Sequence, residues 1–380
     1  MSKTTINKAI EAAEHPILLE SLAQLEEAEK TWINCNILGI DTEFVRERTY
    51  RAELGLVQIS DGETAWLLDP LAVKSYDPLL RMMKNPSILK LLHSGSEDME
   101  VLLNAIGAVP EPLIDTQIAC AMLGQPLQLA YHHALKWLFD VDIDKDQTRS
   151  NWCKRPLNEH QLRYAAMDVV LLPEMLLTLR PKLEDAGRWS GLEEEVTRMR
   201  NNALQAVDPE YAYLRFSAIG RMDNNTLQVL KYLARWRERV ADERNRARGF
   251  VISDSTMLQL ARVKPATAEQ LRDIDDIHPV ALSLYEGTLL QLISDAAEDK
   301  TPVEKFEQLD ERQRQQLKDM RSIVQSRSDE LGVDPALLAS RRELEKLIRA
   351  LAAGSPVPER FLGWRKEIIT DQLMGMVRSL

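Results

Sequence analysis

The sequence NILGIDTEF, residues 36–44, joins an apolar run to two acidic residues. The run up to Ile40 is suited to a buried strand, which we expect to end in Asp41-x-Glu43. Strand side chains alternate with a period of two, so both carboxylates should lie on one side. Burying two like charges is costly, and divalent cations would remove that cost because hard cations take oxygen ligands. The alternative interpretation is an exposed strand end with two solvated acids.

Two more acidic positions follow in the chain. Asp98 ends the sequence HSGSED, residues 93–98, where a strand gives way to a helix. It could be a simple first-turn acid favoured by the helix dipole, and Glu97 competes with it for any special role. Tyr164 and Asp168 in YAAMD are four residues apart and share one helix face. A phenol there can hydrogen-bond a water held on a metal, although a core tyrosine and a surface aspartate would give the same pattern.

In this order the acidic residues and the tyrosine resemble the DEDD exonuclease superfamily in its tyrosine subclass. Residues 33–190 are similar to the ribonuclease D family, and two later helical segments resemble HRDC domains. In one departure, Asn151 stands where the family often has Asp, which affects a local contact but no metal ligand. The motifs that carry the resemblance are Asp115-Thr116-Gln117, Leu138, Asp144-Lys145, Trp152, Arg155-Pro156-Leu157, Gln161 to Ala166, Trp236-Arg237-Glu238 and Val251 to Asp254.

The local pattern predicts strands first and helices later, which is an α/β arrangement. The turn Asp61-Gly62 between two apolar runs predicts a β-hairpin, and Gly107 should end a helix. Breakers over residues 201–225 indicate a domain boundary, and Asn224 or Asn225 could cap the long helix that follows. We expect strands over 36–41, 54–60, 64–68 and 87–92, helices over 17–32 and 97–105, and mainly helix over 115–186.

The resemblance implies a ribonuclease H-like domain, a central mixed β-sheet with flanking helices, followed by two small all-α bundles of the HRDC type. We expect the exonuclease domain over 1–207 and the two helical domains over 208–297 and 298–380. A weak repeat with an offset of about 80 residues, in which Asp254 corresponds to Asp334, agrees with two copies of one bundle.

The composition is that of a globular protein. The 380 residues are 44% hydrophobic and 28% charged, with a net charge of −11. That charge excludes a surface that is basic throughout, but not a local basic face. Residues 1–207 hold 21 Lys and Arg against 31 Asp and Glu, a net −10; residues 208–380 hold 27 against 28, a net −1. Three dispersed cysteines predict no disulfide framework. No apolar run of about 18 residues and no signal peptide is evident, so we expect a cytoplasmic monomer without membrane contact.

The resemblance also implies the chemistry. Asp41, Glu43, Asp98 and Asp168 would hold two divalent cations, Mg²⁺ or Mn²⁺, and Tyr164 would orient the attacking water. The reaction would be hydrolysis of RNA from a free 3′ end, with release of nucleoside 5′-monophosphates and tRNA precursors as substrates. A free tyrosine has a pKa near 10, which favours orientation of the water over general-base catalysis.

Contacts with RNA are assigned less directly. Phe44 could stack on the terminal base, and several cations could bind phosphates, including an arginine cluster between Arg235 and Arg248. Each of these residues could instead be structural: a core Phe, a hydrogen-bonded His, or a salt-bridged helix surface. The candidate set is Phe44, Gln58, His93, Lys145, Arg149, Arg155, Arg237, Arg244 and Lys264.

Two other functions are compatible with the same acidic residues. One is a DNA 3′–5′ exonuclease of the proofreading or helicase-associated type, since a metal site of this kind serves both substrates. The other is an RNA-binding scaffold without activity. The two helical modules and the absence of polymerase or helicase motifs favour RNA, and the complete set of acids favours catalysis.

Overall fold

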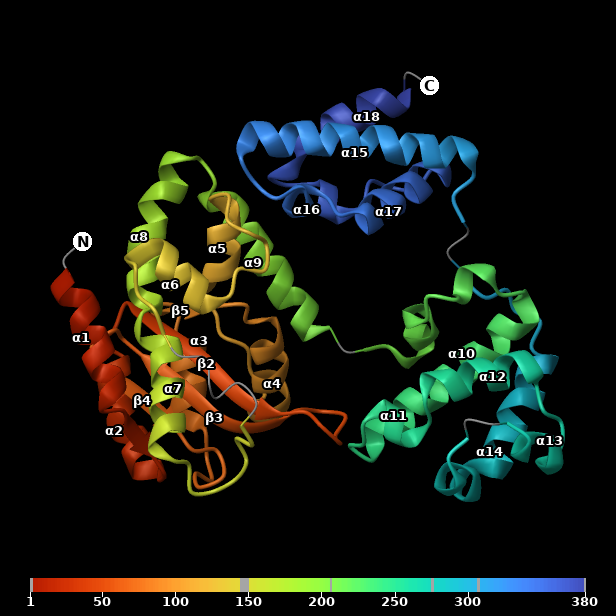
Figure 1. Ribbon diagram of the computed structural model, residues 1–380, viewed down its shortest axis with the longest axis horizontal. Coiled ribbons are helices and arrows are strands. Elements are labelled where there is room, and N and C mark those ends of the chain that lie inside the picture. Colours follow the sequence, from red (N-terminus) through yellow and green to blue (C-terminus); the bar gives the residue numbers. More distant parts are fainter. Residues whose placement is uncertain (1–2, 144–149, 206, 275–276, 306–307, 379–380) are drawn as a thin grey trace. The chain divides into compact units, whose positions relative to one another are not determined.

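The computed structural model describes residues 3–143, 150–205, 207–274, 277–305 and 308–378 (Figure 1). It forms two compact units. The first unit comprises Met1–Val45, Leu54–Gln205 and Leu309–Leu380, and the second comprises Arg46–Glu53 and Ala206–Gln308. The C-terminal helical region, Leu309–Leu380, therefore belongs to the same unit as the exonuclease region. The helical region that precedes it, Ala206–Gln308, belongs to the other unit. The boundaries expected after residues 207 and 297 stay predictions.

The first unit contains a six-stranded mixed sheet with the strand order β1-β4-β3-β2-β5-β6. Strand β4 pairs parallel with β1 and antiparallel with β3, and β5 pairs parallel with β2 and β6. The mixed sheet and the predicted hairpin are confirmed, and Gly62 in the turn has the positive φ of 92° that suits glycine. The strands are β1 Ile17–Leu19, β2 Ile37–Val45, β3 Glu53–Ser60, β4 Ala65–Leu68, β5 Leu89–Leu92 and β6 Leu113–Asp115.

Three boundaries differ from the expected ones. The helix expected over 17–32 is wrong at its start, because Ile17–Leu19 pairs with β4 and the helix begins only after its N-cap, Ser21. Strand β2 does not end at the acidic residues but continues to Val45. Leu113–Asp115, of which only Asp115 was expected to open the helical region, forms an edge strand on β5. In each case pairing with a distant strand decides the local structure.

Helices pack against the sheet and position its acidic strand. Helices α4, α7 and α8 contact β2. Gly39 permits the close approach of α7, because a Cβ there would lie 2.8 Å from the backbone oxygen of Val169. Gly107 has a φ of 80° and ends α4, as predicted. The helices of this region are α1 Lys3–Glu14, α2 Leu22–Trp32, α3 Asp77–Lys84, α4 Ser96–Ile106, α5 Thr116–Met122, α6 Tyr131–Phe139, α7 Glu159–Val170, α8 Leu172–Asp185 and α9 Trp189–Leu204.

The C-terminal helical domain has its own apolar core and is joined to helix α9 by buried ion pairs. Glu195 on α9 is 5% exposed and accepts hydrogen bonds from Arg360, from Arg365 and, at 2.8 Å, from Trp364 Nε1. Arg365 is itself 2% exposed and also donates to the backbone oxygen of Leu337. Its elements are α15 Glu311–Leu331, α16 Pro335–Leu338, α17 Arg341–Ala352, η3 Glu359–Phe361, η4 Lys366–Thr370 and α18 Asp371–Arg378.

The second unit is a helical bundle that also includes the loop between β2 and β3. Tyr50 in that loop donates its hydroxyl to Glu238 at 2.6 Å, and Glu238 is 2% exposed. Asp223 caps the long helix, one residue before the two asparagines that we expected. The elements of this unit are η1 Pro209–Arg215, η2 Ile219–Arg221, α10 Asn224–Glu243, α11 Arg248–Val251, α12 Asp254–Val263, α13 Ala268–Arg272 and α14 Pro279–Glu298.

Two expectations about the chain as a whole can be compared with the structure. Cys35, Cys120 and Cys153 are free thiols, as predicted. Within the ranges that the structure describes, no helix combines the length and the apolar character needed to cross a membrane.

Candidate active site

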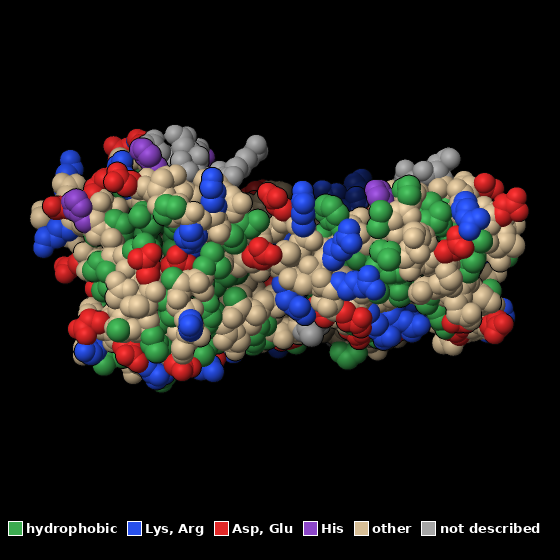
Figure 2. Space-filling model, turned by 90° about the horizontal axis from the view of Figure 1, so that it is seen from below, with side chains coloured by type: hydrophobic (Ala, Val, Ile, Leu, Met, Phe, Trp, Pro, Cys, Tyr) green, Lys and Arg blue, Asp and Glu red, His purple; other side chains and the backbone are tan. Residues whose placement is uncertain are grey.

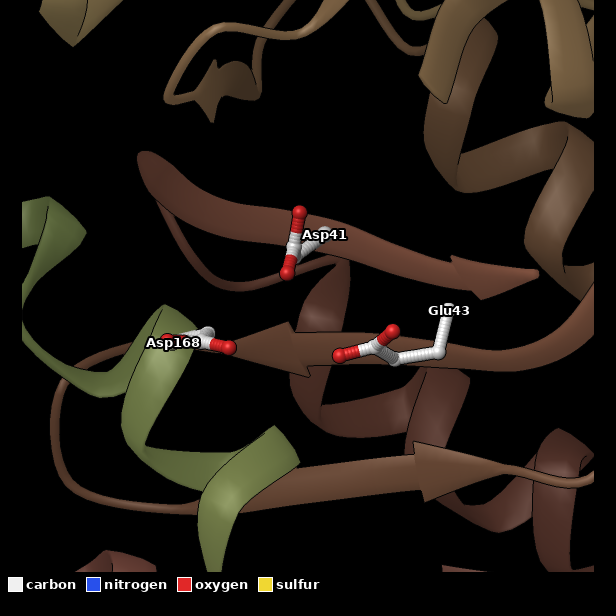
Figure 3. A group of neighbouring side chains, drawn as sticks. All are labelled: Asp41, Glu43 and Asp168. Atoms are coloured by element: carbon white, nitrogen blue, oxygen red, sulfur yellow. The ribbon is translucent and has the colours of Figure 1, made fainter. Parts of the chain in front are cut away.

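Three carboxylates meet where helix α7 packs on strand β2. Asp41 and Glu43 lie two residues apart on the strand, and Asp168 lies near the end of the helix. Each offers an oxygen, and these oxygens lie within 4.8 Å of one another. Figure 3 shows the three carboxylates directed toward one another, Asp168 from the helix and the other two from the sheet. An all-oxygen donor set of this kind suits a hard divalent cation.

The raised pKa values of the three carboxyl groups indicate that the cluster lacks a compensating positive charge. Burial, followed by the charges of Asp98, Asp168 and Glu43, raises the pKa of Asp41 well above its usual value. Burial and the charges of Asp168 and Asp98 raise the pKa of Glu43 to about 9. Burial, against a hydrogen bond from Tyr164, raises the pKa of Asp168 to about 7. Carboxyl groups held so unfavourably for ionisation need a compensating positive charge, so the residues fit divalent cations.

Asp98 lies beside the cluster. It is 7% exposed near the start of α4, and its Oδ1 accepts a hydrogen bond from the hydroxyl of Thr42. Burial raises its pKa to about 6. Among the described residues, Asp98 is not one of the three whose carboxylate oxygens lie within 4.8 Å of one another. Its charge nevertheless raises the pKa values of Asp41 and Glu43. Glu97, the competing acid, is exposed on the surface.

Tyr164 stands one helical turn before Asp168 and hydrogen-bonds it. Its ring lies 6.1 Å from that of Trp152, centroid to centroid, and Trp152 is buried. Burial and then the charges of Asp168, Glu43 and Asp41 raise the pKa of the tyrosine hydroxyl. A phenol that resists ionisation can orient a water but is a poor base.

A cavity of about 760 Å³ adjoins the cluster. Asp41, Tyr164 and Asp168 line it together with His93. Both ring nitrogens of His93 are engaged, at 2.8 Å each, with the hydroxyl of Thr116 and the backbone oxygen of Leu129. Burial lowers the pKa of His93, which favours the neutral ring, and the two contacts fix its orientation.

The structure places the other candidates of the first unit as follows. Phe44 is partly exposed on β2, directly after Glu43. Gln58 on β3 is fully buried, and its amide has no hydrogen-bond partner among the described residues. Lys145 and Arg149 lie outside the residues that the structure describes.

Arg155 is held within the fold. Its guanidinium donates to Asp69 Oδ1 at 2.8 Å and to the backbone oxygens of Gly55 and Trp152 at 2.7 Å each. Asp69 is 3% exposed, so this ion pair is largely shielded from water. An RNA contact through Arg155 would require these bonds to open.

The three candidate cations of the second unit also donate hydrogen bonds within the fold. Arg237 is 5% exposed and donates to Asp254 at 2.6 Å, Arg244 donates to the hydroxyl of Tyr285 at 3.0 Å, and Lys264 donates to Thr226 at 2.9 Å. Figure 2 shows Lys and Arg side chains lying among Asp and Glu on one face of the molecule rather than forming an unbroken basic surface. Within the arginine cluster, carboxylates pair with Arg235, Arg237, Arg239 and Arg248, whereas Arg244 is held by a neutral hydroxyl.

Two residues beside the acids were not among the candidates. Thr42 binds Asp98, and its place between Asp41 and Glu43 could have indicated this. Tyr131 lines the cavity and donates to the backbone oxygen of Met167 at 3.2 Å. No pattern in the sequence connects Tyr131 with Asp168, because they come from different helices.

The mixed sheet, the acidic pair on its strand β2 and the Tyr164-x-x-x-Asp168 helix define the catalytic domain of a 3′–5′ exonuclease. Residues 16–184 match the 3′–5′ exonuclease family. Residues 226–293 match the HRDC domain, and residues 312–373 match the C-terminal HRDC domain of ribonuclease D. The expected order of domain types is thus confirmed.

Whole-length relatives identify the family more closely. Ribonuclease D of Pseudomonas paraeruginosa is 36% identical over 363 residues, which are 94% of this chain and 96% of the relative. Ribonuclease D of Escherichia coli is 34% identical over 95% of this chain and 97% of its own length. The crystal structure of the Escherichia coli enzyme, described as an exoribonuclease involved in structured RNA processing, superimposes with a TM-score of 0.90 over 96% of this chain and 99% of that one, at 32% identity. The chain belongs to the ribonuclease D family and is a 3′–5′ exoribonuclease.

Proposed function

We propose that the protein removes nucleotides one at a time from the 3′ end of RNA by hydrolysis with two divalent cations, Mg²⁺ or Mn²⁺. The observation that carries this proposal is the meeting of Asp41, Glu43 and Asp168 within 4.8 Å in partly buried surroundings. Burial and neighbouring carboxylates raise the pKa values of all three groups, and bound cations would offset that cost of ionisation.

Asp41, Glu43 and Asp168 would hold the cations, and Asp98 would complete the set from the start of α4. When bound, two such cations stabilise the attacking and leaving oxygens of an in-line displacement and lower the pKa of a bound water. Thr42 fixes the carboxylate of Asp98 by its hydrogen bond. The carboxylates therefore act as ligands held in place by the strand and two helix segments.

Tyr164 would orient the attacking water. Its hydroxyl proton is committed to Asp168, which leaves an oxygen lone pair to accept a hydrogen bond from the water. Its raised pKa supports this role rather than that of a proton acceptor. Trp152 supports the ring from one side.

Phe44 and His93 would contact the terminal nucleotide, Phe44 by stacking and His93 from the wall of the cavity. Lys145 and Arg149 would bind phosphates. For the remaining candidates an RNA contact requires a change of partners or of exposure. These are Gln58, Arg155, Arg237, Arg244 and Lys264.

We further infer that the substrates are tRNA precursors and other structured RNAs with 3′ extensions, acted on by a cytoplasmic monomer. The crystal structure of the Escherichia coli relative is described in terms of structured RNA processing. Digestion of a 3′-extended tRNA, resolved at single-nucleotide steps, tests this; release of nucleotides only from unstructured RNA would contradict it.

The catalytic proposal is tested with Asp41→Asn. We expect the substitution to abolish Mg²⁺-dependent release of mononucleotides while RNA binding remains measurable. Glu97→Gln, a change of an exposed acid next to Asp98, is the matched control and should keep full activity. Equal or faster digestion of a matched DNA 3′ overhang would refute the preference for RNA, and a wild-type protein without metal-dependent activity on any RNA would indicate a binding scaffold.

A further inference from the structure

A cleft of about 470 Å³ lies within the C-terminal helical domain, between helix α15 and the segment formed by α16 and the start of α17. Figure 1 shows α15 running alongside these two helices, and both contact it. The floor of the cleft is apolar, with Val324, Ala339 and Leu344 buried there. Its volume is in the range of about 300–1,000 Å³ that is usual for ligand sites.

The rim of the cleft is cationic. Lys318 and Arg321 line it from α15, and Arg341 lines it from α17. All three side chains are exposed, and of the residues that the structure describes no Asp or Glu lines the cleft. Arg314 precedes Lys318 by four residues on the same helix, so Arg314, Lys318 and Arg321 share one face of α15.

Two of these cations are not neutralised. Throughout the described ranges, the charged groups of Lys318 and Arg321 form no ion pair or hydrogen bond. Arg341 pairs with Glu345 at 3.0 Å, but its side chain is 71% exposed, so the pair is weak and can open. The contrast with the first helical domain is clear, because Arg237 and Lys264 there are held by neighbouring side chains.

An apolar floor with unpaired cations at its rim has the chemistry of a site for a nucleotide chain. Phosphates of the chain would contact Lys318 and Arg321, and a base would cover the floor beside Val324. Ser322 and Gln325 at the same rim can hydrogen-bond sugar or base without fixing the sequence. Charge complementarity and the exoribonuclease activity together select RNA as the occupant.

We propose that the cleft between α15 and α17 is an RNA-binding site that holds a single-stranded segment of the substrate away from the catalytic carboxylates. The proposal deepens the proposed function and rests on it only in taking RNA as the ligand. A segment held here adds affinity for long RNA without contributing to the chemical step. Short substrates, which cannot reach both sites, gain nothing from it.

The test compares two double variants of the full chain. Lys318→Gln/Arg321→Gln removes the two unpaired cations of the cleft, and Arg312→Gln/Lys346→Gln removes two exposed cations on the same helices outside it. Binding of a labelled single-stranded 20-nucleotide RNA is measured in chelator over a salt series, and Mg²⁺-dependent hydrolysis of a dinucleotide is measured separately.

We expect the cleft variant to bind the long RNA about tenfold more weakly, with the slope of log K against log salt reduced by about 1.4, as two lost phosphate contacts require. The control should bind as the wild type does, and both variants should hydrolyse the dinucleotide normally. Equal binding of the long RNA by the two variants would overturn the proposal. So would a loss of dinucleotide hydrolysis in the cleft variant as large as its loss of RNA binding. Failure of the proposed function would look different, because the wild type itself would then release no nucleotides with metal.

Discussion

The strongest prediction concerns protons released when a divalent cation enters the acidic cluster. A carboxylate must be deprotonated to bind a metal, so protons held in the metal-free site compete with the cation. The pKa of Glu43 is raised to about 9 and that of Asp41 is also raised well above its usual value, while those of Asp168 and Asp98 are about 7 and about 6. At pH 7.5 Glu43 therefore holds about one proton and Asp168 a fraction of one, and the raised pKa of Asp41 adds to this total.

Binding of Mg²⁺ or Mn²⁺ at pH 7.5 should therefore release at least about one proton per chain. Raising the pH removes the competing protons, so the affinity for the cation increases. The logarithm of the association constant should rise by at least about 1 per pH unit near pH 7.5, because that slope equals the number of protons released.

Calorimetric titration in two buffers of different ionisation enthalpy measures this number. The apparent binding enthalpies should differ by at least about the difference between the ionisation enthalpies of the two buffers. Glu43→Gln, which cannot ionise at that position, should release about one proton fewer than the wild type, and Glu97→Gln should behave as the wild type. Equal enthalpies in the two buffers, or an affinity independent of pH between 6.5 and 8, would refute the assignment of raised pKa values to the cluster.

Three further predictions concern stability, measured by denaturant unfolding. Glu195→Ala should lower the free energy of unfolding by about 3–5 kcal/mol, because it leaves buried arginines without their carboxylate. Glu193→Ala, at an exposed position of the same helix, should lower it by under about 1 kcal/mol. Similar losses for the two variants would contradict the buried ion pairs. Arg155→Ala should cost about 2–4 kcal/mol at pH 7. Burial alone would raise the pKa of Asp69, but the bonds from Arg155 lower it. The stabilisation by this pair therefore exists above the usual aspartate pKa of about 4 and should disappear as the pH falls below that value. An undiminished difference between the wild type and Arg155→Ala at about pH 3 would argue against the pairing. Burial lowers the pKa of Lys90 to about 8, and the unfolded lysine binds its proton up to about pH 10.5. The wild type should therefore gain stability relative to Lys90→Met between pH 8 and 10, and a flat difference over that range would count against it.

The acidic cluster was largely predictable from the sequence, because each of its members depends on local spacing. Asp41 and Glu43 follow the period of a strand, and Tyr164 and Asp168 follow the period of a helix. Their meeting in space was implied only by the resemblance to a family. Physical reasoning from one sequence cannot place a helix on a distant strand, although Gly39 at their contact is consistent with it.

What the sequence could not predict depends on long-range pairing. Ile17–Leu19 has the pattern of a helix start, and parallel pairing with β4 makes it a strand. The environment of Arg155 or Arg237 was equally hidden, because a phosphate-binding arginine and a structural one have the same local sequence. Only their partners, Asp69 and Asp254, distinguish them.

The buried pairing of Glu195 with Arg365 has a consequence for how the protein is made. The two residues are 170 positions apart in the chain. At a translation rate of about 5–20 residues per second, roughly 10–30 seconds pass between the synthesis of the carboxylate and that of its partner. During that time helix α9 exists without the domain that covers it. A later part of the chain thus completes the packing of a catalytic region that was synthesised before it.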